Sequence, residues 1–156
     1  MNIRFHSSVL FVKNIEVSKK FYCQILSQKM EYDFGNNIGL KCGLSLWEVQ
    51  ENHKINKDFY TTSNKNGALE LYFETENIQN IVDEIKQKKN SVYHDLIEES
   101  WGQKTIRFFD PDQNLIEIGE KLEVFIQRMH REGLDIKQIN KKTGVPIDQI
   151  RNIIVQ

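Results

Sequence analysis

The sequence predicts an α+β protein: two βαβββ modules that form a cupped, mostly antiparallel sheet, followed by a C-terminal helical hairpin. Segments 9–22 and 71–85 repeat one plan at a distance of about 60 residues, namely an alternating strand, an asparagine and an amphipathic helix. After residue 120 the strand-like alternation stops, and apolar residues recur at helical spacing. The repeat predicts the paired modules, and the change of period predicts the helical end.

The first module begins with a strand at 4–12, where Val9 and Phe11 share one face with Ser7. Asn14 is a suitable N-cap for a helix that carries apolar residues at helical spacing. A Gly-Asn-Asn turn at 35–37 lies among the strands that complete this module. These strands are expected at about 29–34, 38–41 and 43–49.

The second module follows a polar linker at 50–66 and repeats the order of the first. Asn77 caps a helix with Ile78, Val82 and Ile85 on one face. The remaining strands are expected at about 91–98, 103–109 and 114–119, with a turn at 110–114. The resulting domain boundaries are 1–120 for the sheet domain, with modules at about 1–50 and 67–120, and 121–156 for a helical appendage.

Composition excludes several classes of protein. The chain has 156 residues and a net charge of −1, which argues against a protein that coats nucleic acid or membranes over its whole surface. Cys23 and Cys42 lack metal-type spacing and predict reduced thiols. The chain begins without a signal-like apolar stretch and has no run long enough to cross a bilayer, so a cytoplasmic location is expected.

Strand alternation predicts which side chains face the helices and which face the cup. Continuous apolar sets lie under the helices: Leu69, Leu71, Phe73, Leu44, Leu46, Ile106, Phe108, Ile116 and Ile118. The opposite positions face the cup: Ser7, Val9, Phe11, Ser45, Trp47, Glu70, Tyr72, Thr105, Arg107, Leu115 and Glu117. Trp101 lies in the loop before the seventh strand, at the expected mouth. Aromatic walls with a few polar groups are typical of small-molecule sites.

Arg107 has two interpretations. It forms an internal ion pair with Glu70 or Glu117, or it binds the carboxylate or phosphate of a ligand. Trp47 and Trp101 either fill the core or stack on a ligand. One of the two glutamates as a general base is a further alternative, because burial raises a carboxyl pKa. The residues themselves do not choose among these.

Three features together resemble the glyoxalase/bleomycin-resistance/extradiol-dioxygenase superfamily, which has the vicinal oxygen chelate fold. They are the paired βαβββ units, Ser18 with Phe21-Tyr22 in the first helix, and Asp110-Pro111-Asp112 followed by Glu117. The resemblance covers residues 5–119. It implies a homodimer and, in the metalloenzymes of the family, a divalent ion bound by four strand positions.

Carried over one by one, these metal positions fall on Ser7, Ser45, Glu70 and Glu117. Two hydroxyls and no imidazole are a poor set for a transition metal. His6 lies one residue from the first position, so its side chain enters the cup only if a bulge redirects the strand. We therefore expect no metal cofactor. If a divalent metal binds, Glu70, Glu117 and His6 are the candidate ligands.

Residues 136–151 resemble a helix-turn-helix of the bacterial repressor type. Three features argue against DNA binding: Asn140 in place of a small residue, Asp148 at the start of the second helix, and the short remainder of the chain. The surplus of about three positive charges in 121–156 is modest. The prediction is a hairpin that packs on the sheet, a second copy or a partner protein, without nucleic acid or membrane binding.

The first functional hypothesis is a glyoxalase-like protein that binds a small anionic or aromatic molecule in the cup without a metal. Its expected ligand-binding residues are Ser7, Ser45, Trp47, Glu70, Tyr72, Trp101, Arg107 and Glu117. The alternatives are a divalent-metal lyase, isomerase or dioxygenase of the glyoxalase type, and a ligand-sensing regulator that uses the helical tail. Whether the protein catalyses a reaction, and on what substrate, is left open by the sequence.

Overall fold

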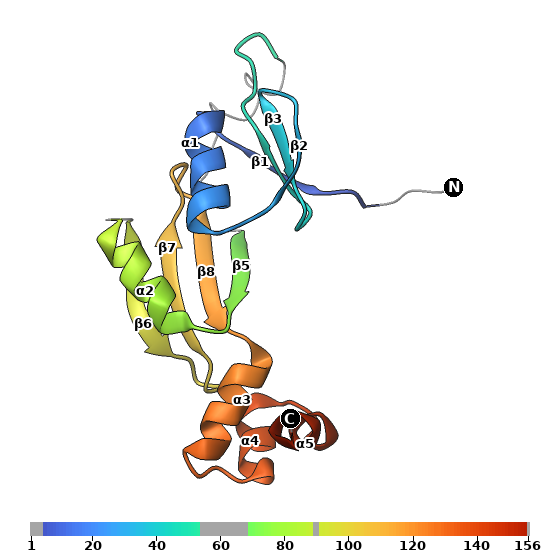
Figure 1. Cartoon of the computed structure of the whole chain (residues 1–156), viewed down its shortest axis with the longest axis vertical. Coiled ribbons are helices and arrows are strands. Elements are labelled where there is room, and N and C mark those ends of the chain that lie inside the picture. The colour runs from blue at the N-terminus through green and yellow to red at the C-terminus, as the bar shows by residue number, and fades with distance from the viewer. Residues whose placement is uncertain (1–4, 54–68, 89–90, 156) are drawn as a thin grey trace. The chain divides into compact units, whose positions relative to one another are not determined.

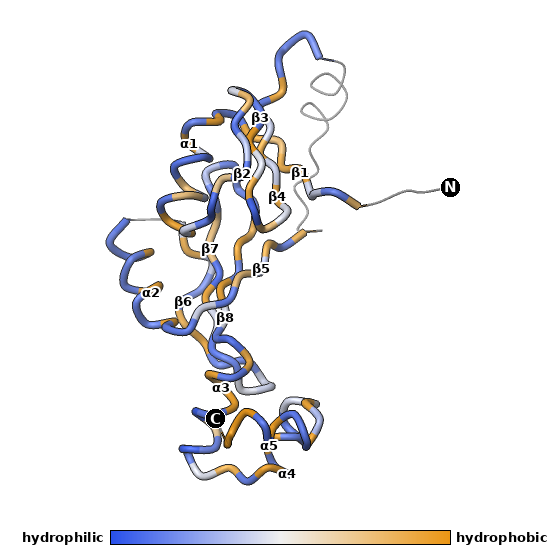
Figure 2. The backbone as a smooth tube through the Cα atoms, turned by 45° about the vertical axis from the view of Figure 1, so that its right-hand side comes forward, coloured by the Kyte–Doolittle hydropathy of each residue, from blue (hydrophilic) through white to orange (hydrophobic). Residues whose placement is uncertain are grey.

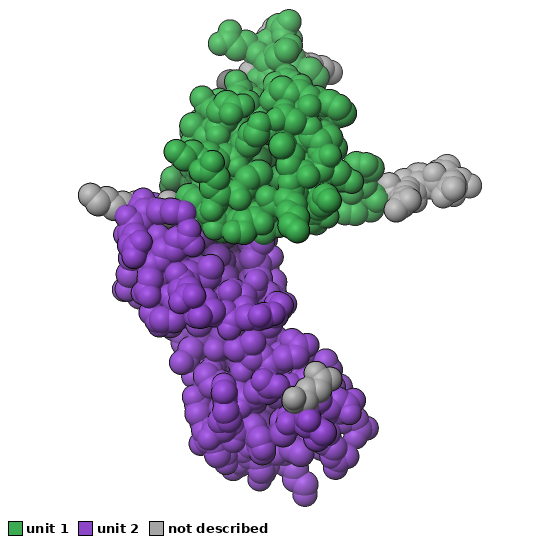
Figure 3. All heavy atoms as spheres, in the orientation of Figure 1, with its two compact units in different colours: residues 1–68, 110–113 green, residues 69–109, 114–156 purple. Residues whose placement is uncertain are grey.

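The computed structural model describes residues 5–53, 69–88 and 91–155, and the chain divides into two compact units (Figures 1 and 3). Unit 1 comprises Met1–Ala68 and Asp110–Gln113, and unit 2 comprises Leu69–Phe109 and Asn114–Gln156. Most of the predicted linker at 50–66 lies outside the described residues.

Unit 1 is the first βαβββ module. Its mixed four-stranded sheet, here sheet A, has the order β1-β4-β3-β2, with β1 parallel to β4 and the other neighbours antiparallel. Helix α1 packs on β3 and β4 and covers one face of the sheet. The elements are β1 (Ser8–Phe11), α1 (Ile15–Lys20), η1 (Phe21–Ile25), β2 (Met30–Asp33), β3 (Asn37–Leu40) and β4 (Leu44–Trp47).

The first helix begins where the sequence predicts, because two side chains satisfy its free backbone N–H groups. Asn14 Oδ1 accepts from Val17 N at 3.0 Å, and Glu48 Oε2 accepts from Ile15 N at 2.6 Å. The helix continues as one wide π-type turn, η1, which carries the buried Phe21 and Tyr22.

Unit 2 contains the second module, with the same topology. Sheet B has the order β5-β8-β7-β6, with β5 parallel to β8. Helix α2 is capped by Asn77 and packs on β7 and β8 through a face that includes the buried Ile78, Val82 and Ile85. The elements are β5 (Glu70–Thr75), α2 (Ile78–Gln87), β6 (Val92–Glu98), β7 (Lys104–Phe109) and β8 (Leu115–Glu120). The predicted fold class is thereby confirmed.

Strand alternation separates core from open face in both sheets, as the alternating colours along the strands in Figure 2 indicate. The apolar positions predicted to lie under the helices on β4, β7 and β8 are buried: Leu44, Leu46, Ile106, Phe108, Ile116 and Ile118. On β5, Leu71 and Phe73 are half-buried. Leu69 departs from the prediction, because it precedes β5 and is 59% exposed.

The C-terminal segment consists of three helices, because α3 (Leu122–Arg131) precedes the predicted hairpin of α4 (Ile136–Thr143) and α5 (Ile147–Val155). They share one apolar core: Phe125, Ile126, Met129, Ile139, Ile150 and Ile153. In the described part of the chain, no helix is long and apolar enough to span a bilayer.

Arg128 connects these helices to sheet B, within the same compact unit. Its guanidinium donates to both carboxylate oxygens of Glu120, at 3.1 and 2.8 Å, and to the Gly102 carbonyl at 2.6 Å. A two-pronged guanidinium–carboxylate pair fixes orientation as well as distance. Lys142 on α4 adds an ion pair with Glu98 at 2.9 Å.

The loop between β7 and β8 belongs to unit 1 and joins two signatures that are far apart in sequence. Tyr22 donates its hydroxyl proton to Asp110 Oδ2 at 2.8 Å, and Ser18 Oγ donates to Asp112 Oδ2 at 3.1 Å. Lys13 N donates to Asp112 Oδ1 at 3.0 Å. Tyr22, Ser18 and Asp110 are at most 2% exposed, so the first bond satisfies two buried groups and the second satisfies the buried Ser18 hydroxyl.

Tyr22→Phe tests this connection. The change removes one hydroxyl and leaves the buried Asp110 carboxylate with one donor fewer, which costs about 1–3 kcal/mol. We expect the free energy of unfolding, measured with urea, to fall by that amount. Tyr93→Phe removes the hydroxyl of a tyrosine that is 65% exposed and is the matched control. Equal effects of the two changes would contradict a structural role for the Tyr22 hydroxyl.

Candidate functional site

Each sheet has a face opposite its helix, called here its open face. On sheet A, strand register places Val9 and Gly39 beside Ser45, and Phe11 beside Trp47. Tyr32 on β2 pairs with Gly39, and its ring lies across that glycine. An added Cβ at Gly39 would lie 2.1 Å from Tyr32 Cε1, so the glycine is required for this position of the ring.

A chain of hydroxyl groups occupies the centre of this open face. Ser45 Oγ lies 3.2 Å from Tyr32 Oη and donates to Ser7 Oγ, also at 3.2 Å. Ser45 is 3% exposed, and the two neighbours satisfy its hydroxyl. Ser7 and Ser45 therefore come together as the sequence predicts. Tyr32 joins them, although it is not among the predicted ligand-binding residues.

Aromatic rings border the hydroxyl chain. The Phe11 and Trp47 ring centroids are 5.9 Å apart, and Tyr32 stacks on Phe34 at 4.7 Å with an interplanar angle of 23°. Phe34 is 75% exposed and Phe11 is 36% exposed. Exposed rings at stacking distance offer a surface for another flat apolar group.

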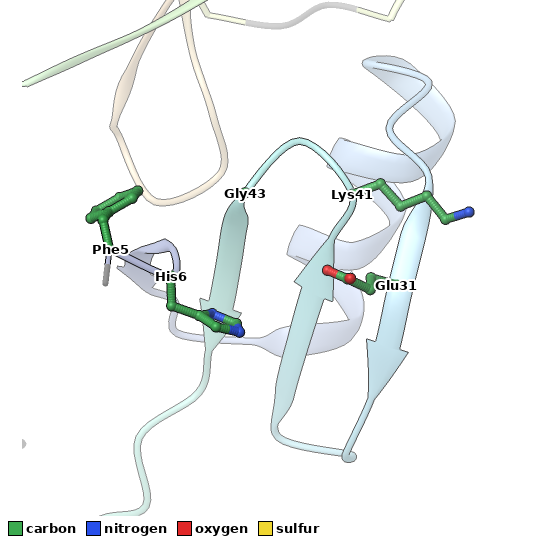
Figure 4. A pocket seen from close by; sticks show the side chains of 5 residues that line it. All are labelled: Phe5, His6, Glu31, Lys41 and Gly43. Carbon is green, nitrogen blue, oxygen red and sulfur yellow. The ribbon is translucent and has the colours of Figure 1, made fainter. Parts of the chain in front are cut away.

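A pocket of about 380 Å³ lies in the same unit. It is lined by Phe5, His6, Glu31, Lys41 and Gly43. Figure 4 shows the His6 ring and the Glu31 carboxylate directed toward each other, whereas the Lys41 side chain points away. His6 thus precedes β1 and lines a pocket with Glu31 in unit 1, while Glu70 and Glu117 lie in unit 2. No signal in the sequence indicates Phe5, Glu31 or Lys41 as partners of His6.

In unit 2, Arg107 is surrounded by carboxylates. Its Nε donates to Glu70 Oε2 at 2.8 Å and its Nη1 to Glu99 Oε1 at 2.8 Å, while Nη2 pairs with Glu117. Nη1 also lies 3.1 Å from His94 Nε2. Because a guanidinium only donates, His94 Nε2 accepts, and its Nδ1 carries the proton that is donated to the Asp95 carbonyl at 2.7 Å.

This network contains three carboxylates and one guanidinium, so it carries a surplus of negative charge. Burial raises the pKa of Glu117 to about 7; the charge of Arg107 opposes the shift and that of Glu70 adds to it. The hydrogen bond from Arg107 lowers the pKa of Glu99. The ion-pair interpretation of Arg107 therefore has direct support, while Glu99 and His94 are partners that no pattern in the sequence indicates.

A second polar chain runs beside this network. Gln103 Nε2 donates to Tyr72 Oη and to the Glu120 carbonyl, each at 2.7 Å, and Trp101 Nε1 donates to Gln103 Oε1 at 3.1 Å. Tyr72 in turn donates to Glu74 at 3.1 Å. Gln103 thus connects Tyr72 and Trp101, which the sequence predicts as ligand-binding residues, and it is itself a buried residue that the prediction missed.

The metal site implied by the fold does not fit these residues. Glu70 and Glu117 both bind Arg107, so each of these carboxylates already has a positively charged partner. Ser7 and Ser45 bind each other. Within residues 5–53, 69–88 and 91–155, no group of three or more His, Cys, Asp or Glu side chains is arranged to hold an ion.

Comparison with known proteins places the chain in a family. The sequence model of the glyoxalase-like domain matches residues 5–123. The chain belongs to the glyoxalase-like domain family. The resemblance to the glyoxalase/bleomycin-resistance/dioxygenase superfamily is thereby confirmed. A search of curated proteins returned no significant match.

Solved structures agree with this membership. A protein of unknown function from Agrobacterium tumefaciens str. C58 is 30% identical over 78% of this chain and 97% of that one, with a TM-score of 0.64. Lactoylglutathione lyase from Agrobacterium tumefaciens is 21% identical over 76% and 93%, with a TM-score of 0.53. A glyoxalase/bleomycin resistance protein/dioxygenase from Alicyclobacillus acidocaldarius is 17% identical over 73% and 88%, with a TM-score of 0.53. The last two show the fold alone.

Glu117→Gln tests the effect of burial on this carboxyl group in the glyoxalase-like domain. With a folded-state pKa near 7, Glu117 keeps its proton in the folded chain at pH values where the unfolded chain has released it. The stability that Glu117 contributes is therefore fully present at pH values below the pKa of an ordinary glutamate. It falls by up to about 1.4 kcal/mol per pH unit as the pH rises from there to about 7. The Glu117→Gln variant has no ionisable group at this position, so its stability lacks this dependence on pH.

The measurement is the free energy of unfolding of both proteins between about pH 5 and about pH 8. We expect the wild type to lose stability relative to Glu117→Gln as pH rises across this window. Glu123→Gln, at an exposed glutamate of α3, is the control and is expected to follow the wild type. Parallel curves for wild type and Glu117→Gln would contradict the raised pKa.

Proposed function

We propose that this glyoxalase-like protein binds a small aromatic molecule on the open face of sheet A, without a metal ion. The observation that carries the proposal is the Tyr32–Ser45–Ser7 hydroxyl chain set among exposed aromatic rings. Hydroxyls at the positions of metal ligands argue against a cation, and rings beside them argue for a stacked ligand.

The aromatic surface supports the flat part of such a ligand. Phe11, Trp47, Tyr32 and Phe34 present ring faces or edges on one unit, and the half-buried Trp47 also lies 5.1 Å from the His53 ring. A stacked aromatic pair contributes about 0.5–1.5 kcal/mol beyond the burial of area. Two or three such contacts contribute about 1–4.5 kcal/mol of the roughly 8 kcal/mol that micromolar binding requires, and burial of the apolar area of the rings has to supply the rest.

The pocket in the same unit is a candidate site for a polar part of the ligand. Its volume of about 380 Å³ lies in the range of small-molecule sites. The His6 imidazole and the Glu31 carboxylate form no side-chain hydrogen bond or ion pair with other described residues, so both are available to a bound molecule. A ligand that carries a hydrogen-bond donor or a positive charge fits the carboxylate.

Arg107 contributes little to the binding of an anion in this proposal. Three carboxylates and His94 already use four of its five N–H donors, and a further anion would meet the negative surplus around it. The aromatic part of the original hypothesis is therefore retained, whereas the anionic part loses its main support.

We further propose that the protein acts in the cytoplasm. Cys23 and Cys42 are free thiols, which suits a reducing compartment. The homodimer implied by the family stays a prediction. Sedimentation equilibrium measures the oligomeric state directly and tests it.

Metal analysis tests the first part of the proposal. Protein purified without chelators should contain far less than one zinc, nickel, manganese or iron ion per chain, because no donor set for such an ion is present among the described residues. Mass spectrometry of the elements measures this. Glu117→Gln should leave the metal content unchanged. A stoichiometric ion that Glu117→Gln removes would overturn the metal-free proposal.

Trp47→Leu tests the stacking surface. A panel of aromatic compounds is titrated into the wild-type protein, with intrinsic tryptophan fluorescence as the signal and calorimetry as confirmation. For any compound that binds, we expect Trp47→Leu to weaken the affinity about tenfold, the value of a lost stacking contact. The matched control, Tyr93→Leu, removes an exposed ring from sheet B and should leave the affinity unchanged. Equal losses in both variants would contradict binding at sheet A.

A further inference from the structure

Helices α4 and α5 meet through a turn that holds them in a fixed geometry. α4 ends at Gly144, which has a φ of +76° and donates its N–H to the Asn140 carbonyl at 2.8 Å. Only three residues, Gly144 to Pro146, separate the two helices. Ile139 and Ile150 are both fully buried in the core of the three helices. This is the arrangement of a helix-turn-helix supported by a third helix, α3.

The outer face of α5 is polar and accessible. Asp148, Gln149, Arg151, Asn152 and Val155 are exposed. Among the described elements, the principal neighbours of α5 are α3 and α4. At 1.5 Å per residue, its nine residues span about 13 Å, a length that the major groove of duplex DNA accepts.

Charge is distributed unevenly between this segment and the rest of the chain. Residues 136–155 contain four basic residues and one acidic residue, a formal charge of +3, so the rest of a chain of net charge −1 carries −4. Within the described residues, Lys137 and Lys141 form no ion pair. They lie four residues apart on one helix and therefore repel each other slightly. An anionic partner that binds both lysines would offset this repulsion.

The helix-turn-helix geometry and the local positive charge together favour one partner. We propose that α4 and α5 bind duplex DNA, with α5 in the major groove and the lysines of α4 at the phosphate backbone. Gln149 and Asn152 carry amides that can pair with adenine, and Arg151 carries a guanidinium that can bind a phosphate. Lys142 and Arg128 make no contribution, because both bind Glu98.

The structure answers each of the three features that argue against DNA binding in the sequence. Asn140 does not disturb the helix packing, because its side-chain amide donates to the Val145 carbonyl at 2.8 Å and so stabilises the turn. Asp148 is paired with Arg151 at 3.0 Å in an exposed ion pair, which is weak enough to rearrange. α5 has the contacts of a packed helix, because its Ile150 and Ile153 are buried in the core that it shares with α3 and α4.

Fluorescence anisotropy with the full-length chain and a labelled duplex of mixed sequence, about 30 base pairs long, tests the proposal. We expect a dissociation constant of about 10⁻⁶ to 10⁻⁴ M. The logarithm of the association constant should fall with the logarithm of salt concentration with a slope of about −3, as for contacts by Lys137, Lys141 and Arg151. A duplex selected from random sequences should bind more tightly, and Gln149→Ala should abolish this preference with little change in the slope.

The double variant Lys137→Glu/Lys141→Glu reverses both lysine charges on α4. It should weaken binding at least tenfold and reduce the slope to about −1. The matched control, Lys20→Glu/Lys29→Glu, makes the same change of net charge on unit 1 and should bind like the wild type. Circular dichroism confirms that all variants keep their helices.

Three results would overturn the proposal. They are an absence of binding at low salt, equal losses in the two double variants, and self-association through α5. Sedimentation with wild type and Arg151→Glu detects the last: a dimer lost in the variant would assign this face to a second copy of the chain. None of these results bears on the aromatic ligand of sheet A, because Trp47 lies in unit 1, whereas Lys137, Lys141 and Arg151 lie in unit 2.

Discussion

The hydrogen bonds between the Asp110–Asp112 turn and the first helix are the constraint on which unit 1 depends. Tyr22 and Ser18 donate to two carboxylates that lie 88 and 94 residues away in sequence. The turn leaves sheet B after β7 and returns to it at β8, yet it packs with the first module. A buried Asp110 carboxylate with too few donors would be costly, and so would a buried Tyr22 or Ser18 hydroxyl without an acceptor, so the turn and the helix stabilise each other.

The second organising feature is the alternation of side chains along each strand, by which successive residues point to opposite faces of the sheet. One face of each sheet packs under its helix through aliphatic side chains, and the opposite face carries rings, hydroxyls and charges. On sheet A this open face is aromatic, with a chain of hydroxyls at its centre. On sheet B it is acidic, with one arginine between glutamates. The same repeat therefore produces two surfaces of different chemistry, and the aromatic one is the surface for which we propose a small-molecule ligand.

Arg107 and Arg128 show how sheet B accommodates its many carboxylates. Each guanidinium binds several of them, and loss of either would leave buried glutamates unpaired, at a cost of about 3–5 kcal/mol. Arg107 thereby pairs with Glu70 and Glu117, two of the positions at which the family implies metal ligands. Arg128 fixes α3 against the sheet, which makes the helical tail part of unit 2 and orients α4 and α5 as one body with it.

The sequence by itself determined the secondary structure and the parity of the strands, because apolar alternation, asparagine caps and turn residues act over a few neighbouring positions. It also indicated that Ser7, Ser45, Glu70, Arg107 and Glu117 lie on the open faces. The tertiary structure alone decided which side chains form hydrogen bonds with these residues. Tyr32 reaches Ser45 across Gly39. His94 reaches Arg107 from β6, and Glu99 reaches it from the loop that follows β6. Such pairings depend on register between distant strands and on a bulge in β2, which no local pattern specifies.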